Sequence, residues 1–287
     1  MTNKFGLSFY LMPLVGIASA ATQLNYKVTY DFNSSTSGDQ FSGNGVGGWS
    51  QDIANPSAFG QTFPLAYVSA TNFGGGSSNS AHLGTQVANT PNNASTTLTG
   101  DLTSLTAGGQ PNAGHVYNYI SASFNLAVLD NSSDTFTGRD AFSVALTTAS
   151  GAEAATIGLS PTSGNNDSWD VSVTAGSTTS TTGGTITANS AYKFYIESLD
   201  GSTTFKYEAA DGTGNTWISS VDFDVVSPFT NTLNQVTGIA FSHDPLASAG
   251  TSANTLAFDE ISVQIPEPSS SLLMVLSAGL IAIRRRR

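Results

Sequence analysis

Acidic side chains are the first candidates for chemistry in this sequence, because paired carboxylates can serve as general acid and nucleophile. Retaining glycosidases need two carboxyl groups roughly 5–5.5 Å apart. Asp222 and Asp224 form the best such pair, since residues at i and i+2 of a strand point to the same side. A lone Asp-x-Asp beside valine and phenylalanine is more typical of the solvent face of an edge strand. We therefore expect no catalytic residue.

Other chemistry-bearing residues are sparse. The histidines at 82, 115 and 243 lack metal-ligand spacing, and the sequence has no nucleophile elbow, P-loop or dinucleotide fingerprint. Trp169 and Trp217 lie in strand-like runs and are expected in the core. Trp49 follows the glycine-rich stretch GNGVGGWS, so we expect it to be exposed and to be a ligand-binding residue.

Charge excludes one large class of partners. From Ala21 to Ile265 the chain has 19 acidic residues against 4 basic ones, which gives a net charge of −15. Such a surface repels phosphate backbones, so no nucleic-acid partner is expected. The chain contains no cysteine, which rules out disulfides and thiolate metal sites.

The N-terminal sequence predicts a secretory signal peptide over residues 1–21. Lys4 supplies the positive charge, an apolar stretch follows, and small residues at Ala18, Ala20 and Ala21 form the cleavage pattern. The partners this implies are the Sec machinery and signal peptidase.

The last residues, 265–287, predict a second targeting segment. An apolar helix over 271–283 would be too short for a stable span, since its 12 residues from Leu272 to Ile283 rise about 18 Å against a hydrocarbon core of roughly 30 Å. Positive charges at Arg284, Arg285, Arg286 and Arg287 stay on the cytoplasmic side. The span is therefore expected to be transient, in the inner membrane.

Pro266, Glu267 and Pro268, followed by a serine-rich joint, the short apolar helix and the basic cluster, resemble the PEP-CTERM sorting domain. The resemblance implies export from a Gram-negative bacterium that makes extracellular polysaccharide. It also implies recognition by an exosortase, processing near the Pro-Glu-Pro motif, and a final place at the cell surface or outside the cell. The prolines would keep the motif extended.

Residues 22–264 predict one all-β domain. Runs such as LNYKVTYDF and AYKFYIES alternate apolar and polar residues, and Gly/Asn/Asp turns separate them. The Ser/Thr-rich stretch 174–190 is expected to be an exposed loop or an edge hairpin. The fold class expected is an antiparallel β-sandwich.

This body also resembles concanavalin-like and carbohydrate-binding-module jelly rolls. The resemblance rests on Tyr30-Asp31-Phe32, the GNGVGGWS loop, the segment 72–84 and the last strand from Phe258 to Val263. It implies adjacent first and last strands, and a structural Ca²⁺ near Asp31 and Asp259. Strict alternation turns Asp259 inward with Ile261, whereas a bulge at Asp259-Glu260 would turn both acids outward.

The function expected is that of an exported surface or matrix protein with a non-catalytic glycan-binding, adhesive or structural body, whose partner is extracellular polysaccharide. The alternative is a secreted glycan-active hydrolase of concanavalin-like fold.

Overall fold

The structure is a computed structural model of the 287-residue chain. It describes residues 27–41, 46–53, 66–70, 79–84, 95–105, 119–130, 139–165, 167–176, 178–181, 184–199, 202–210, 236–245 and 254–265, and the backbone of 217–225. Two sheets of eight strands make up this part, and every strand pairing described in it is antiparallel. The predicted all-β sandwich is confirmed.

Sheet A contains the first and last described strands. Its order is β14 (Trp217–Val225), β13 (Ser202–Ala210), β12 (Tyr192–Leu199), β6 (Tyr119–Asp130), β16 (Asn254–Gln264), β4 (Ser80–Gly84) and β3 (Ala66–Ser69), and β1 (Lys27–Tyr30) pairs with β16. One edge of β16 is thus shared, because β4 pairs with its first half and β1 with its last four residues.

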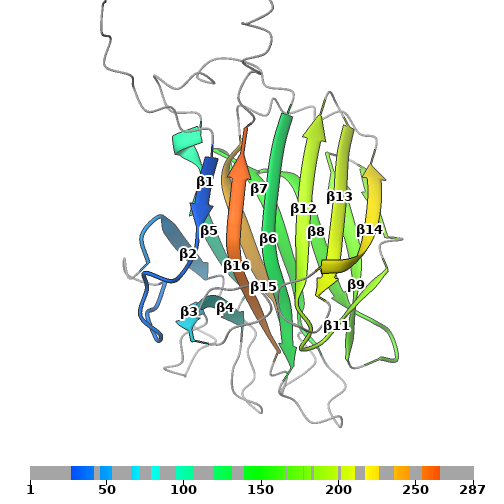
Figure 1. The fold of residues 1–287 in the computed structure, drawn as a ribbon, viewed down its shortest axis with the longest axis horizontal. Coiled ribbons are helices and arrows are strands. Elements are labelled where there is room, and N and C mark those ends of the chain that lie inside the picture. Colours follow the sequence, from blue (N-terminus) through cyan, green and yellow to red (C-terminus); the bar gives the residue numbers. More distant parts are fainter. Residues whose placement is uncertain are drawn as a thin grey trace, which may run out of the picture.

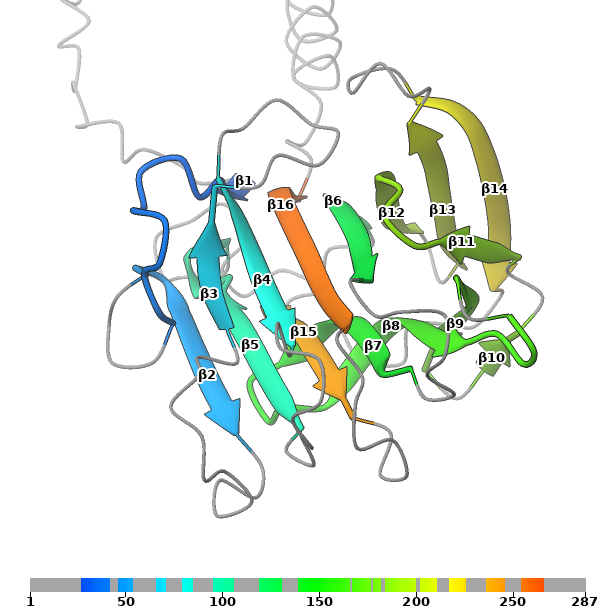
Figure 2. The same ribbon diagram turned by 90° about the horizontal axis from the view of Figure 1, so that it is seen from below.

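Sheet B lies behind sheet A (Figure 1), and the two appear as separate layers from below (Figure 2). Its order is β10 (Thr178–Ser180), β9 (Ser168–Ala175), β8 (Glu153–Pro161), β7 (Ala141–Thr148), β15 (Val236–Asp244), β5 (Thr96–Asp101) and β2 (Trp49–Ile53), with β11 (Thr185–Thr187) also paired to β9. A 3-10 turn, η2 (Thr103–Leu105), follows β5. The Ser/Thr-rich stretch 174–190 therefore supplies short strands beside β9, as predicted.

One hydrophobic core lies between the sheets, and alternation in the sequence fills it. On β12 the side chains of Tyr192, Phe194 and Ile196 are buried in the core, while the residues between them face outward. Phe124 of β6 stacks on Phe194 with ring centroids 5.8 Å apart. Trp169 is fully buried, which confirms its predicted place in the core.

The N-terminal and C-terminal strands of the described chain leave the sandwich side by side. Lys27 lies opposite Gln264, and Tyr30 opposite Ile261. Figure 1 shows β1 starting and β16 ending at the top of the molecule, whereas β6 ends at the bottom. The expected adjacency of first and last strands is confirmed. Among the described residues, no helix has the length and apolar character that a membrane crossing requires.

Candidate functional site

The solvent side of sheet A carries the most promising set of side chains. Because Phe124 and Phe194 point into the core, their neighbours along β6 and β12 point outward. The cross-strand register then brings together polar residues from three adjacent strands. We call this set the polar face: Lys193, Tyr195 and Glu197 of β12, Lys206 and Glu208 of β13, and Asn125 of β6, which lies on the same side of the sheet but is buried.

Tyr195 stands at the centre of the polar face. The ammonium groups of Lys193 and Lys206 each lie 5.5 Å from the centroid of its ring. Its hydroxyl donates to Glu208 Oε2 at 3.2 Å, and Lys206 Nζ lies 2.6 Å from Glu208 Oε1. Two cations thus lie near the half-buried ring of Tyr195, at a distance that favours attraction between a cation and an aromatic face.

Electrostatics keep the Tyr195 hydroxyl protonated. Burial, the charge of Glu208 and its hydrogen bond, and the charge of Glu197 together raise the pKa of Tyr195 to about 12. The hydroxyl therefore remains a hydrogen-bond donor at neutral pH.

The next strand on this side, β16, carries a bulge. The pairing of β16 with β6 shifts between Asp259 and Ser262, and Glu260 has φ of 49°. As a result Phe258 and Ile261 both reach the core, three residues apart. Strict alternation, which would have turned Asp259 inward with Ile261, is therefore wrong.

Asp259 nevertheless does not face open solvent. It lies on the outer side of sheet A, opposite Asn125, and is 5% exposed. Burial and the charges of Glu260 and Asp31 raise its pKa to about 7, although backbone N–H groups of Glu260 and Phe32 donate to it and oppose that shift. The predicted alternative, a bulge at Asp259-Glu260 that turns both acids outward, is therefore confirmed, although Asp259 is buried and not solvated on that side.

The residues around this bulge partly fit a calcium ion. Asn125 Nδ2 donates to Glu260 Oε2 at 3.3 Å, while the buried Oδ1 of Asn125 has no hydrogen-bond partner. Calcium takes six to eight oxygen ligands, and amide oxygens are among them. Within the described ranges, however, no three His, Asp or Glu side chains gather closely enough to hold a metal. Calcium here would need Asn125 and backbone carbonyls in addition to Asp31 and Asp259.

A buried hydrogen-bonded chain continues the outer side of sheet A beyond β16. Tyr67 Oη lies 3.1 Å from His82 Nδ1, and Ser80 Oγ lies 3.0 Å from His82 Nε2. Burial lowers the pKa of His82 to about 4, so the imidazole is neutral at physiological pH. Tyr67, His82 and Ser80 thus add polar but uncharged groups to the outer side of sheet A.

Trp49 is not the exposed ligand-binding residue that the sequence suggested. Its side chain is 9% exposed and packs among aromatic rings from both sheets. The ring centroids of Phe32, Phe41, Tyr30, Phe241 and Phe258 all lie within 6.0 Å of it. The glycine-rich stretch before it lets the chain enter the core at this point, because Gly48 has φ of 81° and lies against the Tyr30 ring. Trp49 is a core residue.

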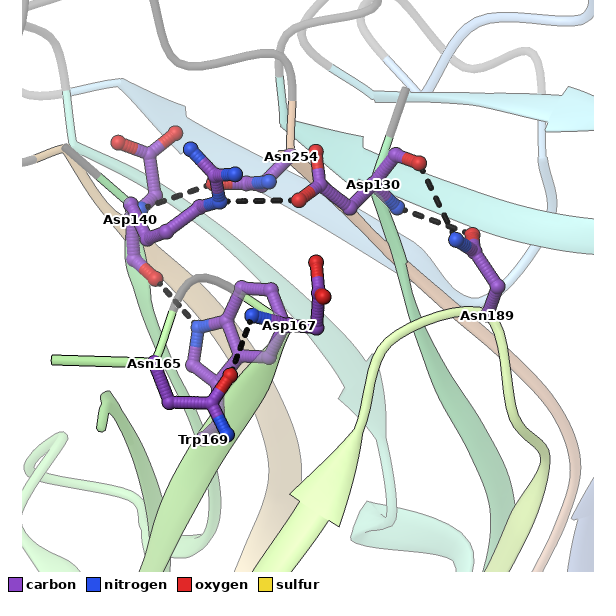
Figure 3. Close-up of polar contacts among 8 residues, drawn as sticks. Asp130, Asp140, Asn165, Asp167, Trp169, Asn189 and Asn254 are labelled. Carbon is purple, nitrogen blue, oxygen red and sulfur yellow. Dashed lines mark hydrogen bonds and ion pairs between the residues drawn. The ribbon is translucent and has the colours of Figure 1, made fainter. Parts of the chain in front are cut away.

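A second polar cluster lies at the far end of the sandwich, where β6 ends and β7 and β16 begin (Figure 3). Arg139 Nε contacts Asp130 Oδ2 at 2.9 Å, and both side chains are at most 5% exposed. Asp140 accepts from Trp169 Nε1 at its carbonyl, and its N–H donates to Asn254 Oδ1. These bonds tie four chain segments together: the end of β6, residues 139–140, β9 and the start of β16.

Deeper in this cluster, His243 Nε2 lies 2.8 Å from Asp140 Oδ2, with both side chains fully buried. A buried pair of this kind is costly to break, because the remaining partner would be left in the core. The contacts of Asp130, Asp140 and Asn254 drawn in Figure 3 thus join neighbouring segments at this end of the sandwich.

Several predicted residues lie outside the described residues. They are the signal-peptide positions Ala18, Ala20 and Ala21, the motif Pro266, Glu267 and Pro268, the cluster Arg284, Arg285, Arg286 and Arg287, and His115. The backbone of β14 places Asp222 opposite Lys206 and Asp224 opposite Thr204, but the side chains of Trp217, Asp222 and Asp224 are not among those described.

The sequence contained a signal for the polar face, but the prediction used the alternation only to find core residues. Lys193, Tyr195 and Glu197 form the outward half of the same alternation that placed Tyr192 and Phe194 in the core. An aromatic residue at an outward position between charged residues is the pattern to look for. Its partners on β13 could be found only with the register.

The fold of this chain is similar to those of several solved structures. The chain is similar to a GH131 β-glucanase catalytic domain from Podospora anserina, with 15% identity, 82% of this chain and 94% of that chain covered, and a TM-score of 0.48. It is also similar to lectin II from Ulex europaeus, with 12% identity, 83% and 99% coverage and a TM-score of 0.45. The CBM2 module of the evolved Dit of Lactobacillus casei BL23 phage J-1 gives 14% identity, 76% and 98% coverage and a TM-score of 0.44.

No curated protein sequence matches the chain. Its C-terminal segment does match a known family: residues 264–287 are a PEP-CTERM protein-sorting motif, which implies an exported surface protein that an exosortase sorts at the membrane.

Proposed function

We propose that the body of this sorted protein is a non-catalytic module that binds a glycan of the extracellular matrix on the polar face of sheet A. The observation that carries the proposal is Tyr195, a half-buried ring with Lys193 and Lys206 close to it and with its hydroxyl bonded to Glu208. The remaining members of the polar face surround it with hydrogen-bonding groups of both kinds.

This arrangement suits a sugar because a pyranose ring has an apolar C–H face and a rim of hydroxyls. The face can stack on the tyrosine ring, while the lysines donate and the carboxylates accept at the rim. The contacts within the set already fix Tyr195 in place, so little side-chain freedom is lost on binding. Adhesion to matrix polysaccharide, or a structural place within it, follows from such binding.

The alternative remains a glycan-active hydrolase. That chemistry needs two carboxyl groups free to act on one glycosidic bond. On the polar face, Glu208 is bonded to both Tyr195 and Lys206, which favours a binding role for it over a catalytic one.

One experiment separates the two functions. The protein purified from the exporting cells is incubated with a panel of immobilised polysaccharides, and retained protein and released reducing ends are both measured. Retention without release supports the binding module, whereas release of reducing ends shows the hydrolase. A protein that neither binds nor cleaves any member of a panel that includes the host's own polysaccharide contradicts both.

Variants locate the binding surface. Tyr195→Ala is expected to weaken retention at least tenfold, and Tyr195→Phe, which keeps the ring, to weaken it far less. Thr156→Ala, on β8 of sheet B, is the control and should bind like the parent chain. Equal losses for the alanine variants at 195 and 156 would place the glycan elsewhere.

We also propose that a calcium ion binds at the bulge of β16. Asp31 and Asp259 would hold it, with Asn125 Oδ1 as a neutral ligand, and the ion would neutralise the acids at the bulge. It would have a structural role, joining β16 to the segment that follows β1.

A further inference from the structure

The sorting motif overlaps the folded body. The matched segment starts at Gln264, which is also the last residue of β16. Gln264 lies opposite Lys27 of β1 on one side and Ser121 of β6 on the other. The next residue, Ile265, is 1% exposed and belongs to the hydrophobic core. No linker therefore separates the fold from the segment that the sorting enzyme must recognise.

Very little chain lies between the folded body and the Pro-Glu-Pro motif. Pro266 follows the buried Ile265 directly in the sequence, and an extended chain advances at most about 3.6 Å per residue, so two residues span no more than roughly 7 Å. The matched sorting segment includes Gln264 and Ile265, so an enzyme that grips the motif together with the residues before it would have to take up both. Those residues are held in sheet A while the body is folded.

The end of β16 pairs separately from the rest of the strand, although its opening would expose the buried side chains of Val263 and Ile265. The bulge at Glu260 shifts the pairing with β6, so Ser262–Gln264 form a short ladder of their own. Their other neighbour, β1, has only four residues, and its side chains alternate between exposed and half-buried. Separation of this end would leave the pairing of Asn254–Asp259 with β6 intact.

We infer that opening of the β1–β16 end controls access of the sorting enzyme to the tail. In the closed sheet the enzyme cannot take up Gln264 and Ile265, and in the open one it can. Processing therefore competes with the pairing of β1 to β16. This inference rests on the sorting motif and not on the proposed glycan binding.

A disulfide across this strand pair tests it directly. The chain has no cysteine, so Lys27→Cys with Gln264→Cys creates a single possible bridge. Directly opposed residues of antiparallel strands have Cα atoms about 4.5–5.5 Å apart, which a disulfide accommodates. The full chain is expressed in a host that processes it, and the fraction retaining Arg287 is measured by intact mass.

The oxidised double variant is expected to be processed at least tenfold more slowly than the parent chain. The matched control is Thr156→Cys with Thr174→Cys, opposed residues of β8 and β9 in sheet B, which should be processed at the parent rate when oxidised. Equal processing of the two cross-linked chains would overturn the inference.

A second variant separates access from misfolding. A six-residue Gly/Ser insertion between Ile265 and Pro266 moves the motif away from the sheet, so the cross-linked chain should again be processed at the parent rate. If the cross-linked chain with the insertion stays unprocessed, the bridge acts through export or folding, and control by strand opening is wrong.

Discussion

The rings of Phe241 and Phe258 stack face to face, with centroids 3.9 Å apart and planes 5° apart. Phe241 belongs to β15 of sheet B and Phe258 to β16 of sheet A, so this stack joins the two layers at the centre of the core. Both rings also contact Trp49.

Truncation of this stack should be costly. Phe258→Ala is expected to lower the free energy of unfolding by about 3–5 kcal/mol, because it removes a fully buried ring and leaves a cavity between sheets that cannot collapse. Urea unfolding followed by circular dichroism measures the change. Val28→Ala, which truncates a half-buried residue of β1, is the comparison and should cost much less. Similar losses for both would mean that the centre of the core is not where the stability lies.

Gly84 should tolerate no side chain. Its φ is 125°, and a Cβ placed there would come within 2.6 Å of the Asn254 carbonyl oxygen, which belongs to the neighbouring strand. Gly84→Ala is therefore expected to destabilise the protein by roughly 3 kcal/mol or more, from strain and a backbone clash together.

Gly151 provides the matched control for that substitution. Its φ is 78°, but nothing lies within 4 Å of the Cβ position. Gly151→Ala should thus cost only the conformational penalty, about 1–2 kcal/mol. Thermal unfolding of both variants checks the difference, and a Gly84→Ala protein as stable as the Gly151→Ala protein would contradict the close strand contact.

His82 and Asp259 should have opposite effects on stability between pH 4 and pH 6.5. Burial lowers the pKa of His82 from 6.5 to about 4, so below pH 6.5 the unfolded chain binds a proton that the folded chain refuses, and stability falls as pH falls. Burial raises the pKa of Asp259 from 3.8 to about 7, so above pH 3.8 the unfolded chain releases a proton that the folded chain keeps, and stability falls as pH rises. Each full shift corresponds to roughly 3–4 kcal/mol.

Single variants should reveal these two opposed contributions. Asp259→Asn leaves His82, so its stability should rise from pH 4 to pH 6.5 more steeply than that of the parent chain. His82→Gln leaves Asp259, so its stability should fall relative to the parent between pH 4 and pH 7. Urea midpoints are compared across this range with EDTA present, and parallel curves for all three proteins would show that neither group titrates as described.

Calcium should stabilise the fold if the bulge holds it. Millimolar CaCl₂ added after EDTA treatment is expected to raise the melting temperature by several degrees. Asp31→Asn and Asp259→Asn should abolish that rise, whereas Asp52→Asn, at an exposed position on β2, should keep it. A melting temperature that ignores calcium in the parent chain removes the proposed ion.

How much of this could be predicted depends on whether the signal is local. The alternation in AYKFYIES indicated which residues of β12 face the core, and Trp169 is buried as its strand-like surroundings predicted. The bulge at Glu260 had only an indirect signal, since Phe258 and Ile261 are both apolar but would lie on opposite faces of a regular strand. Whether the strand bulges there depends on neighbours in space, so the sequence left both arrangements open. The side on which Asp259 lies therefore could not be read with certainty.

For the candidate site, Trp49 likewise shows that a local sequence pattern can be overridden by residues far away in the sequence. Glycines before a tryptophan suggested an exposed loop, yet the rings that bury Trp49 come from positions as distant in the sequence as 241 and 258. Tyr195 is the converse case, since its outward position was visible in the sequence but the lysine of β13 that flanks it required the register of β12 with β13.

The pairing of β1 with β16 also has a kinetic consequence. When the chain is made or exported from its N-terminus, the first described strand emerges long before its partner, and contacts so distant in sequence form slowly because a very large loop must close. Until then the edge of β1 lacks its neighbour and is open to wrong pairing with other chains. The sorting segment emerges directly after the strand that ends this vulnerable period, so maturation of the tail and completion of the fold fall within the same short interval.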